Sequence, residues 1–301
     1  MLDCAFLRGA LFGCAAVLCA IPPIAAQQSP AQQEPVSPLP FATFDAASEP
    51  VLADPHDVVI GPGDRLYVAD KFANRIAILD RDTLEVIGSF GDGELSSPHD
   101  VDFDAADRAI IADTGNHRIA IYDLSSGVAK FAGALIGIGR PEGALAHPNG
   151  RIYATSSGFG AIMAFENGIA VATAQGLSGA HDIATDSDGN LWVADTGNRR
   201  IVKYSPDLEV LAVLDDPKYR WAGPRYLDVD PLGRLVVADQ DAHRIVMIGR
   251  DGALIGVLGN GVPGMGANRF DDPEGVEIAG SMYFFADSDN NRIVRYQVVM
   301  N

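Results

Sequence analysis

The segment Asp-Thr-Gly-Asn-His-Arg-Ile at residues 113–119 returns almost unchanged as Asp-Thr-Gly-Asn-Arg-Arg-Ile at residues 195–201. Outward from these two copies, the chain is self-similar from residue 55 onward, with a period of about 43 residues. In most units an Asp follows fourteen or fifteen residues after the first position. Such a period indicates a propeller or a related array. The six units open at Pro55, Pro98, Pro141, Ala180, Pro224 and Pro273.

Each unit holds four strand-length pieces separated by turn residues, which predicts six four-stranded sheets around a channel. In the first unit the expected strands are 56–60, 65–69, 75–79 and 85–90. The last unit lacks a fourth strand, whereas the segment 41–45 precedes the first unit and matches its fourth strand in pattern. We therefore expect 41–45 to complete blade six and to leave no open sheet edge.

An Arg stands five residues after the Asp that follows each second strand, and we interpret the two as a structural pair across the turn. The third unit supports this interpretation, because Ser156 and Ala161 replace both members together. Losing one partner alone would leave a poorly compensated charge. The expected pairs are Asp70–Arg75, Asp113–Arg118, Asp195–Arg200, Asp239–Arg244 and Asp287–Arg292.

The words at 113–119 and 195–201 resemble the signature of the NHL repeat. The resemblance covers residues 41–299 and implies an all-β, six-bladed β-propeller. It is specific for the fold and says little about function.

The first 26 residues are typical of a signal peptide, with Arg8, an apolar run at 10–21 and small residues at Ala25 and Ala26. Residues 27–40 are rich in Gln and Pro and are expected to form a flexible linker. We thus expect a periplasmic or secreted protein with its propeller at 41–301. A mature chain of this kind would have no disulfides, because the three cysteines are Cys4, Cys14 and Cys19.

The chain carries 22 Lys and Arg against 40 Asp and Glu, a net charge of −18. A surface of this sign repels phosphate backbones and anionic headgroups, which argues against nucleic-acid binding and membrane insertion of the mature chain. It suits divalent cations, and we expect a monomer that binds a small molecule or a peptide.

The second position of each unit is the most informative for function, because it collects three of the six histidines. The first strand of a propeller blade lines the channel, so these six side chains should converge at one mouth. Apolar residues would line a channel at a lower desolvation cost. The position is occupied by His56, His99, Glu142, His181, Arg225 and Glu274.

Alternate blades give three-fold geometry, which divides the ring into two sets. His99, His181 and Glu274 form a donor set for Zn²⁺, and Fe²⁺ or Mn²⁺ would also be accepted. In the other set, His56 is a candidate general base, fourth metal ligand or hydrogen-bond partner, and Arg225 is a candidate carboxylate binder. The competing interpretation is that the histidines only contact water and each other in a wet channel. The Asp after each ring histidine either orients the imidazole or satisfies backbone at the strand start, and we favour the backbone role.

The motifs at Pro98-His99-Asp100-Val101 and Ala180-His181-Asp182-Ile183 resemble those of peptidyl-α-hydroxyglycine α-amidating lyases. That resemblance implies zinc at the channel mouth, with Glu274 standing where the third histidine of those enzymes would be. Streptogramin lyases, with a histidine-and-glutamate metal site on a seven-bladed ring, and the six-bladed calcium-binding lactonases are more loosely similar.

Two hypotheses follow. The first is a metal-dependent lyase or hydrolase with zinc on His99, His181 and Glu274, and with a structural calcium ion as a secondary candidate. His56 and Arg225 would be catalytic in this enzyme, and Lys71, Glu142 and Tyr226 would contact the substrate. The second hypothesis is a non-catalytic propeller that presents its channel face to a peptide or a protein partner.

Overall fold

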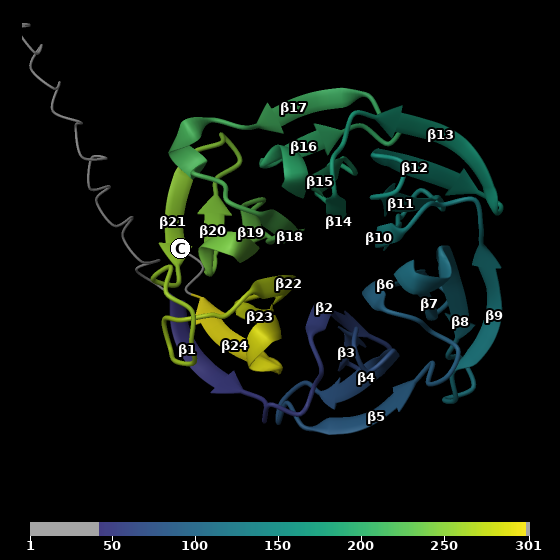
Figure 1. Ribbon diagram of the computed structural model, residues 1–301, viewed down its shortest axis with the longest axis horizontal. Coiled ribbons are helices and arrows are strands. Elements are labelled where there is room, and N and C mark those ends of the chain that lie inside the picture. Colours follow the sequence, from purple (N-terminus) through teal and green to yellow (C-terminus); the bar gives the residue numbers. More distant parts are fainter. Residues whose placement is uncertain (1–41, 299–301) are drawn as a thin grey trace, which may run out of the picture. The chain divides into compact units, whose positions relative to one another are not determined.

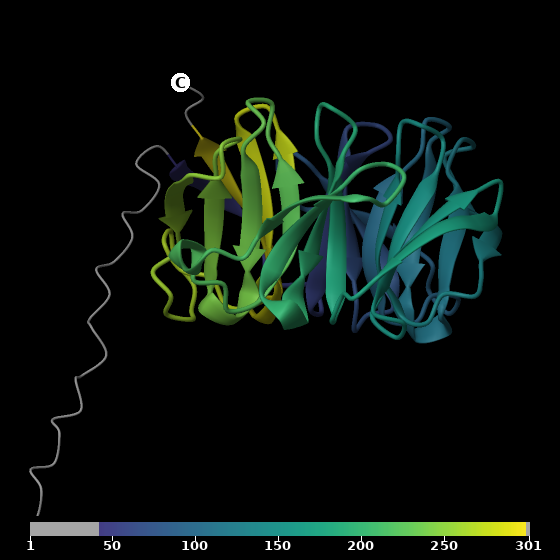
Figure 2. The same ribbon diagram turned by 90° about the horizontal axis from the view of Figure 1, so that it is seen from above.

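The computed structural model describes residues 42–298. Six four-stranded antiparallel sheets surround a central channel, and the first strand of each sheet is innermost (Figure 1). Viewed from the side, the strands cross the thickness of the ring (Figure 2). The expected six-bladed, all-β propeller is confirmed.

The blades follow one another along the chain, and the strands of each blade run in order from the innermost outward. Blade one contains β2 (Pro55–Gly61), β3 (Arg65–Asp70), β4 (Arg75–Asp80) and β5 (Val86–Phe90). Blade two contains β6 (Pro98–Phe103), β7 (Arg108–Asp113), β8 (Arg118–Asp123) and β9 (Lys130–Leu135). Blade three contains β10 (Pro141–Ala146), β11 (Ile152–Ser156), β12 (Ala161–Glu166) and β13 (Ile169–Gln175). Blade four contains β14 (Ala180–Thr185), β15 (Leu191–Asp195), β16 (Arg200–Tyr204) and β17 (Val210–Leu214). Blade five contains β18 (Pro224–Val229), β19 (Leu235–Asp239), β20 (Arg244–Ile248) and β21 (Leu254–Leu258). Blade six contains β22 (Pro273–Ala279), β23 (Met282–Asp287), β24 (Arg292–Val298) and β1 (Ala42–Ala47).

Short 3₁₀ turns join the second and third strands of four blades, and a fifth lies in the linker before blade five. They are η1 (Thr114–Asn116), η2 (Thr196–Asn198), η3 (Pro217–Tyr219), η4 (Gln240–Ala242) and η5 (Ser288–Asn290).

The hydrophobic core lies between the blades, because the first three strands of each sheet are apolar on both faces. Between blades one and two, for example, Tyr67 packs edge-on against Phe103 with ring centroids 4.7 Å apart. Six such clusters follow one another around the ring. The channel wall is thus held in place by packing behind it.

The ring is closed by β1, which pairs antiparallel with β24 from Ala42 opposite Val298 to Ala47 opposite Val294. Phe44 packs against Tyr296 with ring centroids 5.6 Å apart. In Figure 1 the purple strand β1 lies beside the yellow strand β24. The expectation that 41–45 completes blade six is confirmed over its described part, and Phe41 lies outside the described residues.

The five expected Asp–Arg pairs are all present, with Nε to Oδ2 distances of 2.6 to 2.8 Å. The second carboxylate oxygen accepts a backbone N–H from the linker that enters the same blade, as Asp195 does from Ser178 at 2.7 Å. In blade three, Ser156 instead donates to the Gly139 carbonyl at 2.6 Å. Each turn therefore fastens the linker before its blade, which is a wider role than the turn contacts expected from the sequence.

The expected signal peptide at 1–26 and the linker at 27–40 lie outside the described residues. No helix among residues 42–298 is long and apolar enough to cross a membrane.

Candidate functional site

The six ring residues come together at one mouth of the channel, each carried near the start of an innermost strand. A cavity of about 520 Å³ opens there. The ring residues that line it are His99, Glu142, His181 and Arg225, whereas His56 and Glu274 lie behind them with 1% of each side chain exposed. The other lining residues are Lys71, Ser97, Thr114, Gly115, His117, Arg140, Ser157 and Gly179.

The two lining histidines face Glu142, which comes from the blade between theirs. The Nε2 atom of His99 lies 3.1 Å from Glu142 Oε2, and that of His181 lies 3.8 Å from the same oxygen. This oxygen is buried and has no hydrogen-bond partner, while Oε1 accepts a hydrogen bond from Ser157 at 2.7 Å. Two imidazoles and one carboxylate oxygen therefore converge on a common point.

Backbone contacts fix which nitrogen of each histidine faces Glu142. His99 Nδ1 lies 2.9 Å from the Ser97 carbonyl, and His181 Nδ1 lies 2.7 Å from the Gly179 carbonyl. A carbonyl can only accept, so both Nδ1 atoms carry a proton and a neutral ring presents the Nε2 lone pair. Burial lowers the pKa of His99 to about 2, with a further contribution from the charge of His56. Burial and the charge of Arg225 likewise hold the pKa of His181 well below 6.5.

Glu274, the third ligand expected from the sequence, lies elsewhere in the ring. Its Oε2 is 2.7 Å from His56 Nδ1, although neither atom has a well-aligned hydrogen bond. Its Oε1 accepts from Gln240 at 2.7 Å and lies 3.4 Å from Arg225 Nε. Arg225 also donates to the Gln240 amide oxygen. Glu274 is thus held by His56, Arg225 and Gln240, and Glu142 stands with His99 and His181.

Lys71 connects the cavity to His56. Its Nζ lies 2.9 Å from His56 Nε2 and 3.0 Å from Asp54 Oδ2, which is itself 3.2 Å from His56 Nε2. Burial alone would lower the pKa of His56, but the charge of Glu274 and the contact with Asp54 outweigh burial and raise it. A neutral ring can accept from Lys71 and a protonated ring can donate to Asp54. His56 can therefore hold either protonation state.

Tyr226 lies beneath the ring and does not line the cavity. It is fully buried, with its ring 6.4 Å from both His56 and His181. Its hydroxyl crosses from blade five to blade two and donates to the His99 carbonyl at 2.7 Å. Tyr226 therefore supports the histidine backbone, and its side chain leaves no exposed surface for a ligand.

Comparison with protein families adds to this geometry. The family model of the NHL repeat matches residues 95–122 and 177–204. These segments include the innermost strands β6 and β14, which carry His99 and His181. The chain is a six-bladed propeller with NHL repeats. None of the curated proteins matches this NHL propeller significantly.

Several solved propellers share the fold of this NHL propeller. Catalytically inactive virginiamycin B lyase from Staphylococcus aureus, with quinupristin, is 14% identical, covers 86% of this chain and 100% of its own, and has a TM-score of 0.64. An auxiliary nutrient binding protein from Bacteroides thetaiotaomicron is 18% identical over 85% of this chain and 76% of its own, with a TM-score of 0.65. PQQ-bound aldose sugar dehydrogenase from Streptomyces coelicolor is 13% identical over 86% and 98%, with a TM-score of 0.65. At these identities the similarity establishes the fold alone.

The NHL propeller also has a second ring position, directly after the Asp or Ser that ends each second strand. In blades two, four and six a hydroxyl there donates to the first carbonyl of the next blade, as Thr196 does to Pro224 at 2.7 Å. In blades one, three and five the residue contacts a side chain of the ionisable ring, and these residues are Lys71, Ser157 and Gln240. Thr196 of blade four also lies 3.2 Å from His181 Nδ1. Sequence reasoning singled out Lys71 alone. Blades one and five have Lys and Gln where blades two, four and six have Thr or Ser, and this difference in the sequence could have identified the second ring position. Ser157 of blade three is the same residue type as Ser288 and differs from it only in the group that it contacts.

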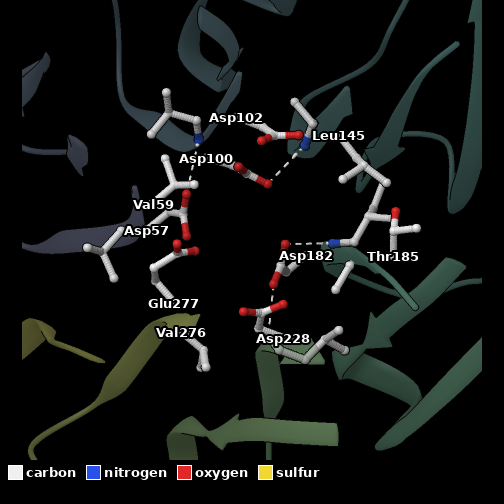
Figure 3. A pocket seen from close by; sticks show the side chains of 16 residues that line it. Asp57, Val59, Asp100, Asp102, Leu145, Asp182, Thr185, Asp228, Val276 and Glu277 are labelled. Carbon is white, nitrogen blue, oxygen red and sulfur yellow. Dashed lines mark hydrogen bonds between the residues drawn. The ribbon is translucent and has the colours of Figure 1, made fainter. Parts of the chain in front are cut away.

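Below Tyr226 the channel contains a second, acidic cavity of about 110 Å³ (Figure 3). The Asp that follows each ring histidine points into it. Asp57 accepts the Val101 N–H of the next blade, Asp100 accepts that of Ala144, and Asp182 accepts that of Leu227. These Asp side chains therefore bind backbone N–H groups, as expected, but the N–H groups belong to the neighbouring blade, so that each hydrogen bond joins two blades. The carboxylates in the lining are Asp57, Asp100, Asp102, Asp182, Asp228 and Glu277.

Proposed function

We propose that the mouth cavity is the active site of a metal-dependent lyase or hydrolase. A divalent metal ion, with zinc as the preferred candidate, would be held by His99, His181 and Glu142. The observation that carries this proposal is the meeting of two Nε2 lone pairs with an unpartnered, buried carboxylate oxygen. Three acceptors in contact repel one another unless a cation or a proton lies among them.

The two distances from Glu142 Oε2 to the histidine Nε2 atoms suit a shared ion. Ligand atoms at about 2.0–2.2 Å from one Zn²⁺ lie roughly 3.2–3.6 Å apart. The 3.1 and 3.8 Å separations from Glu142 bracket this range. Among residues 42–298 no group of three or more His, Cys, Asp or Glu side chains is placed so that it could hold a metal ion. The proposal therefore requires the three side chains to move when the metal binds.

A metal bound at this point would polarise a substrate oxygen or activate a water molecule. The protein's own side chains would do the rest. Arg225 and Lys71 face the cavity and would bind a substrate carboxylate. Lys71 also reaches His56, which is placed to take up or release a proton through it. Export to the periplasm or the exterior remains part of this proposal, as the N-terminal sequence predicts.

The second candidate is a non-catalytic propeller that binds a small molecule or a peptide. The lack of a complete three-ligand group in the described part of the chain favours it. In this case the proton would be the cation, because burial raises the pKa of Glu142 and a protonated carboxyl could donate to His99.

Elemental analysis and zinc titration calorimetry of the purified protein separate the two candidates. We expect stoichiometric metal in the unaltered protein and a loss of zinc affinity of at least about tenfold in Glu142→Gln, since losing a ligand costs no less than losing a ligand's hydrogen-bond partner. The matched Glu274→Gln variant should keep its zinc affinity within about threefold, since a ligand loss is what lowers affinity. A His99→Ala/His181→Ala variant should bind no zinc and keep its melting profile. An unaltered protein that contains no metal and gives no zinc isotherm would contradict the metal site.

A further inference from the structure

Two exposed aromatic residues break the repeat at the mouth. The turns of blades two, four and six continue with Gly-Asn or Asp-Asn, and the Asn reaches back to the Asp of its own turn, as Asn116 does to Asp113 at 2.8 Å. Blade one has Phe72 in its turn and blade three has Phe159. These side chains are 68% and 54% exposed. A Phe side chain cannot make the hydrogen bond to the turn Asp that Asn makes in blades two, four and six, and at both positions it leaves apolar surface exposed.

One aromatic residue contacts a cation that lines the cavity, and the other packs on the residue before such a cation. Lys71 Nζ lies over the Phe72 ring at 4.6 Å from its centroid. The Phe159 ring packs on Gly139, where an added Cβ would lie 2.9 Å from a ring carbon, and Gly139 precedes Arg140. Lys71 and Arg140 both line the cavity. The apolar rim and the cationic interior are therefore adjacent.

Blade two lies between blades one and three, and its turn lines the cavity through Thr114, Gly115 and His117. Ile136, in the linker that enters blade three, is 78% exposed. An extended apolar chain that leaves the cavity over Gly115 would thus have Phe72 on one side and Phe159 and Ile136 on the other.

The interior favours an anion although the protein as a whole carries −18. Three cationic side chains line it, namely Lys71, Arg140 and Arg225, against the single carboxylate of Glu142. The compensating carboxylates Asp54 and Glu274 lie behind them, with 13% and 1% of their side chains exposed. A ligand in the cavity therefore meets positive charge first.

We propose that the ligand of the mouth is an amphipathic carboxylate. Its anionic end lies against Lys71 and Arg225, and an unbranched hydrocarbon chain leaves over the turn of blade two between Phe72 and Phe159. The inference rests on the proposed function only in placing the ligand in the mouth cavity, and it needs no metal.

Titration calorimetry with butanoate, octanoate and decanoate tests this inference, on chelator-treated and on zinc-loaded protein. Decanoate should bind at least about tenfold more tightly than butanoate in both forms, because each buried methylene adds to the affinity. Phe72→Ser/Phe159→Ser should keep the butanoate affinity and lose the gain with chain length. The matched control is Phe131→Ser, which removes a 44%-exposed Phe from β9 and should keep the gain.

Equal affinities for the three carboxylates in the unaltered protein would overturn the inference, and so would a chain-length gain that survives in the double variant. Binding to neutral phosphatidylcholine vesicles through Phe72 and Phe159, without a chain-length gain in solution, would overturn it in favour of a surface-docking rim. The failure of the metal proposal is seen separately, as a missing zinc isotherm together with a chain-length gain that persists in chelator.

Discussion

In five of the six blades a buried Asp fixes the turn beside the channel mouth. Asp195 is fully buried, and it binds Arg200 at 2.6 Å and the Ser178 N–H at 2.7 Å. Ser156 takes this place in blade three and makes neutral hydrogen bonds to Gly139 and Phe159. Charge-assisted bonds are roughly twice as strong as neutral ones, so the turns of the ring are not equally strong.

We predict that Asp195→Ala lowers the free energy of unfolding by about 2–3 kcal/mol, because it leaves Arg200 and a linker N–H without their partner. Ser156→Ala removes only neutral hydrogen bonds and should cost about 1 kcal/mol. Urea unfolding monitored by circular dichroism measures both values. Equal losses in the two variants would show that the charged pair adds nothing to the turn.

Among the elements, the six-residue strand β1 closes the ring by completing the sheet of blade six. It is far in sequence from β24, yet it covers the outer edge of that strand and packs Phe44 on Tyr296. Ser48, just after it, donates its backbone N–H to the Ile293 carbonyl at 2.9 Å and accepts the Ile293 N–H with its hydroxyl at 3.0 Å. Without this segment, β24 would be an open edge strand.

We predict that a chain starting at residue 50 loses on the order of 5 kcal/mol of unfolding free energy, through lost ladder hydrogen bonds and exposed apolar surface. Its thermal transition should broaden and move to lower temperature. A chain starting at residue 42 is the matched control and should melt like one starting at residue 27. Identical melting of the chains that start at 42 and 50 would refute closure by β1.

At the scale of the whole molecule, ring closure gathers carboxylates that are distant in sequence into one small cavity. Burial, together with the charges of Asp182 and Asp102, raises the pKa of Asp228 to about 8. Burial raises the pKa of Asp102 to about 6. The folded state therefore binds protons that the unfolded chain releases near pH 4.

A raised pKa contributes stability that is fully present below the unfolded value and is lost as pH rises through the folded value. We predict that the free energy of unfolding falls from pH 7 toward pH 8 and levels off near pH 9, where Asp228 is ionised in both states. The window lies above pH 7 because His99 and His181, with lowered pKa values, act in the opposite direction below it.

Chemical denaturation of Asp228→Asn should show a flatter dependence over pH 7–9 than the unaltered protein. The matched variant Asp82→Asn, at an exposed turn, should keep the original slope. A slope that is unchanged in Asp228→Asn would show that this carboxyl does not titrate in the window.

Much of the fold could be predicted because it depends on residues that are close together in the sequence. Turn words, strand-length apolar runs and the repeat position of each Asp and Arg need only neighbouring residues to act. The closing strand could be predicted from its match to Gly88-Ser89-Phe90. Ser157 could not be assigned to the ring, because a hydroxyl in a turn has many partners within reach and the same residue type donates to a backbone carbonyl in blade six. Tyr226, expected to contact the substrate, is buried and does not line the cavity, because successive side chains of a strand point to opposite faces.

The sequence by itself determined the six-bladed propeller and the set of ionisable residues that meet at one channel mouth. The position of a residue in the repeat determines where its side chain lies along the channel axis. The period of the sequence gives no information on which neighbouring side chain it contacts. The tertiary structure decided which members of the ring touch. Three-fold symmetry alone would join Glu274 to the histidines, but Gln240, Arg225 and His56 hold it, while Glu142 lies between His99 and His181. Lateral pairing depends on side-chain length and on partners from neighbouring turns, and only the closed ring brings these together.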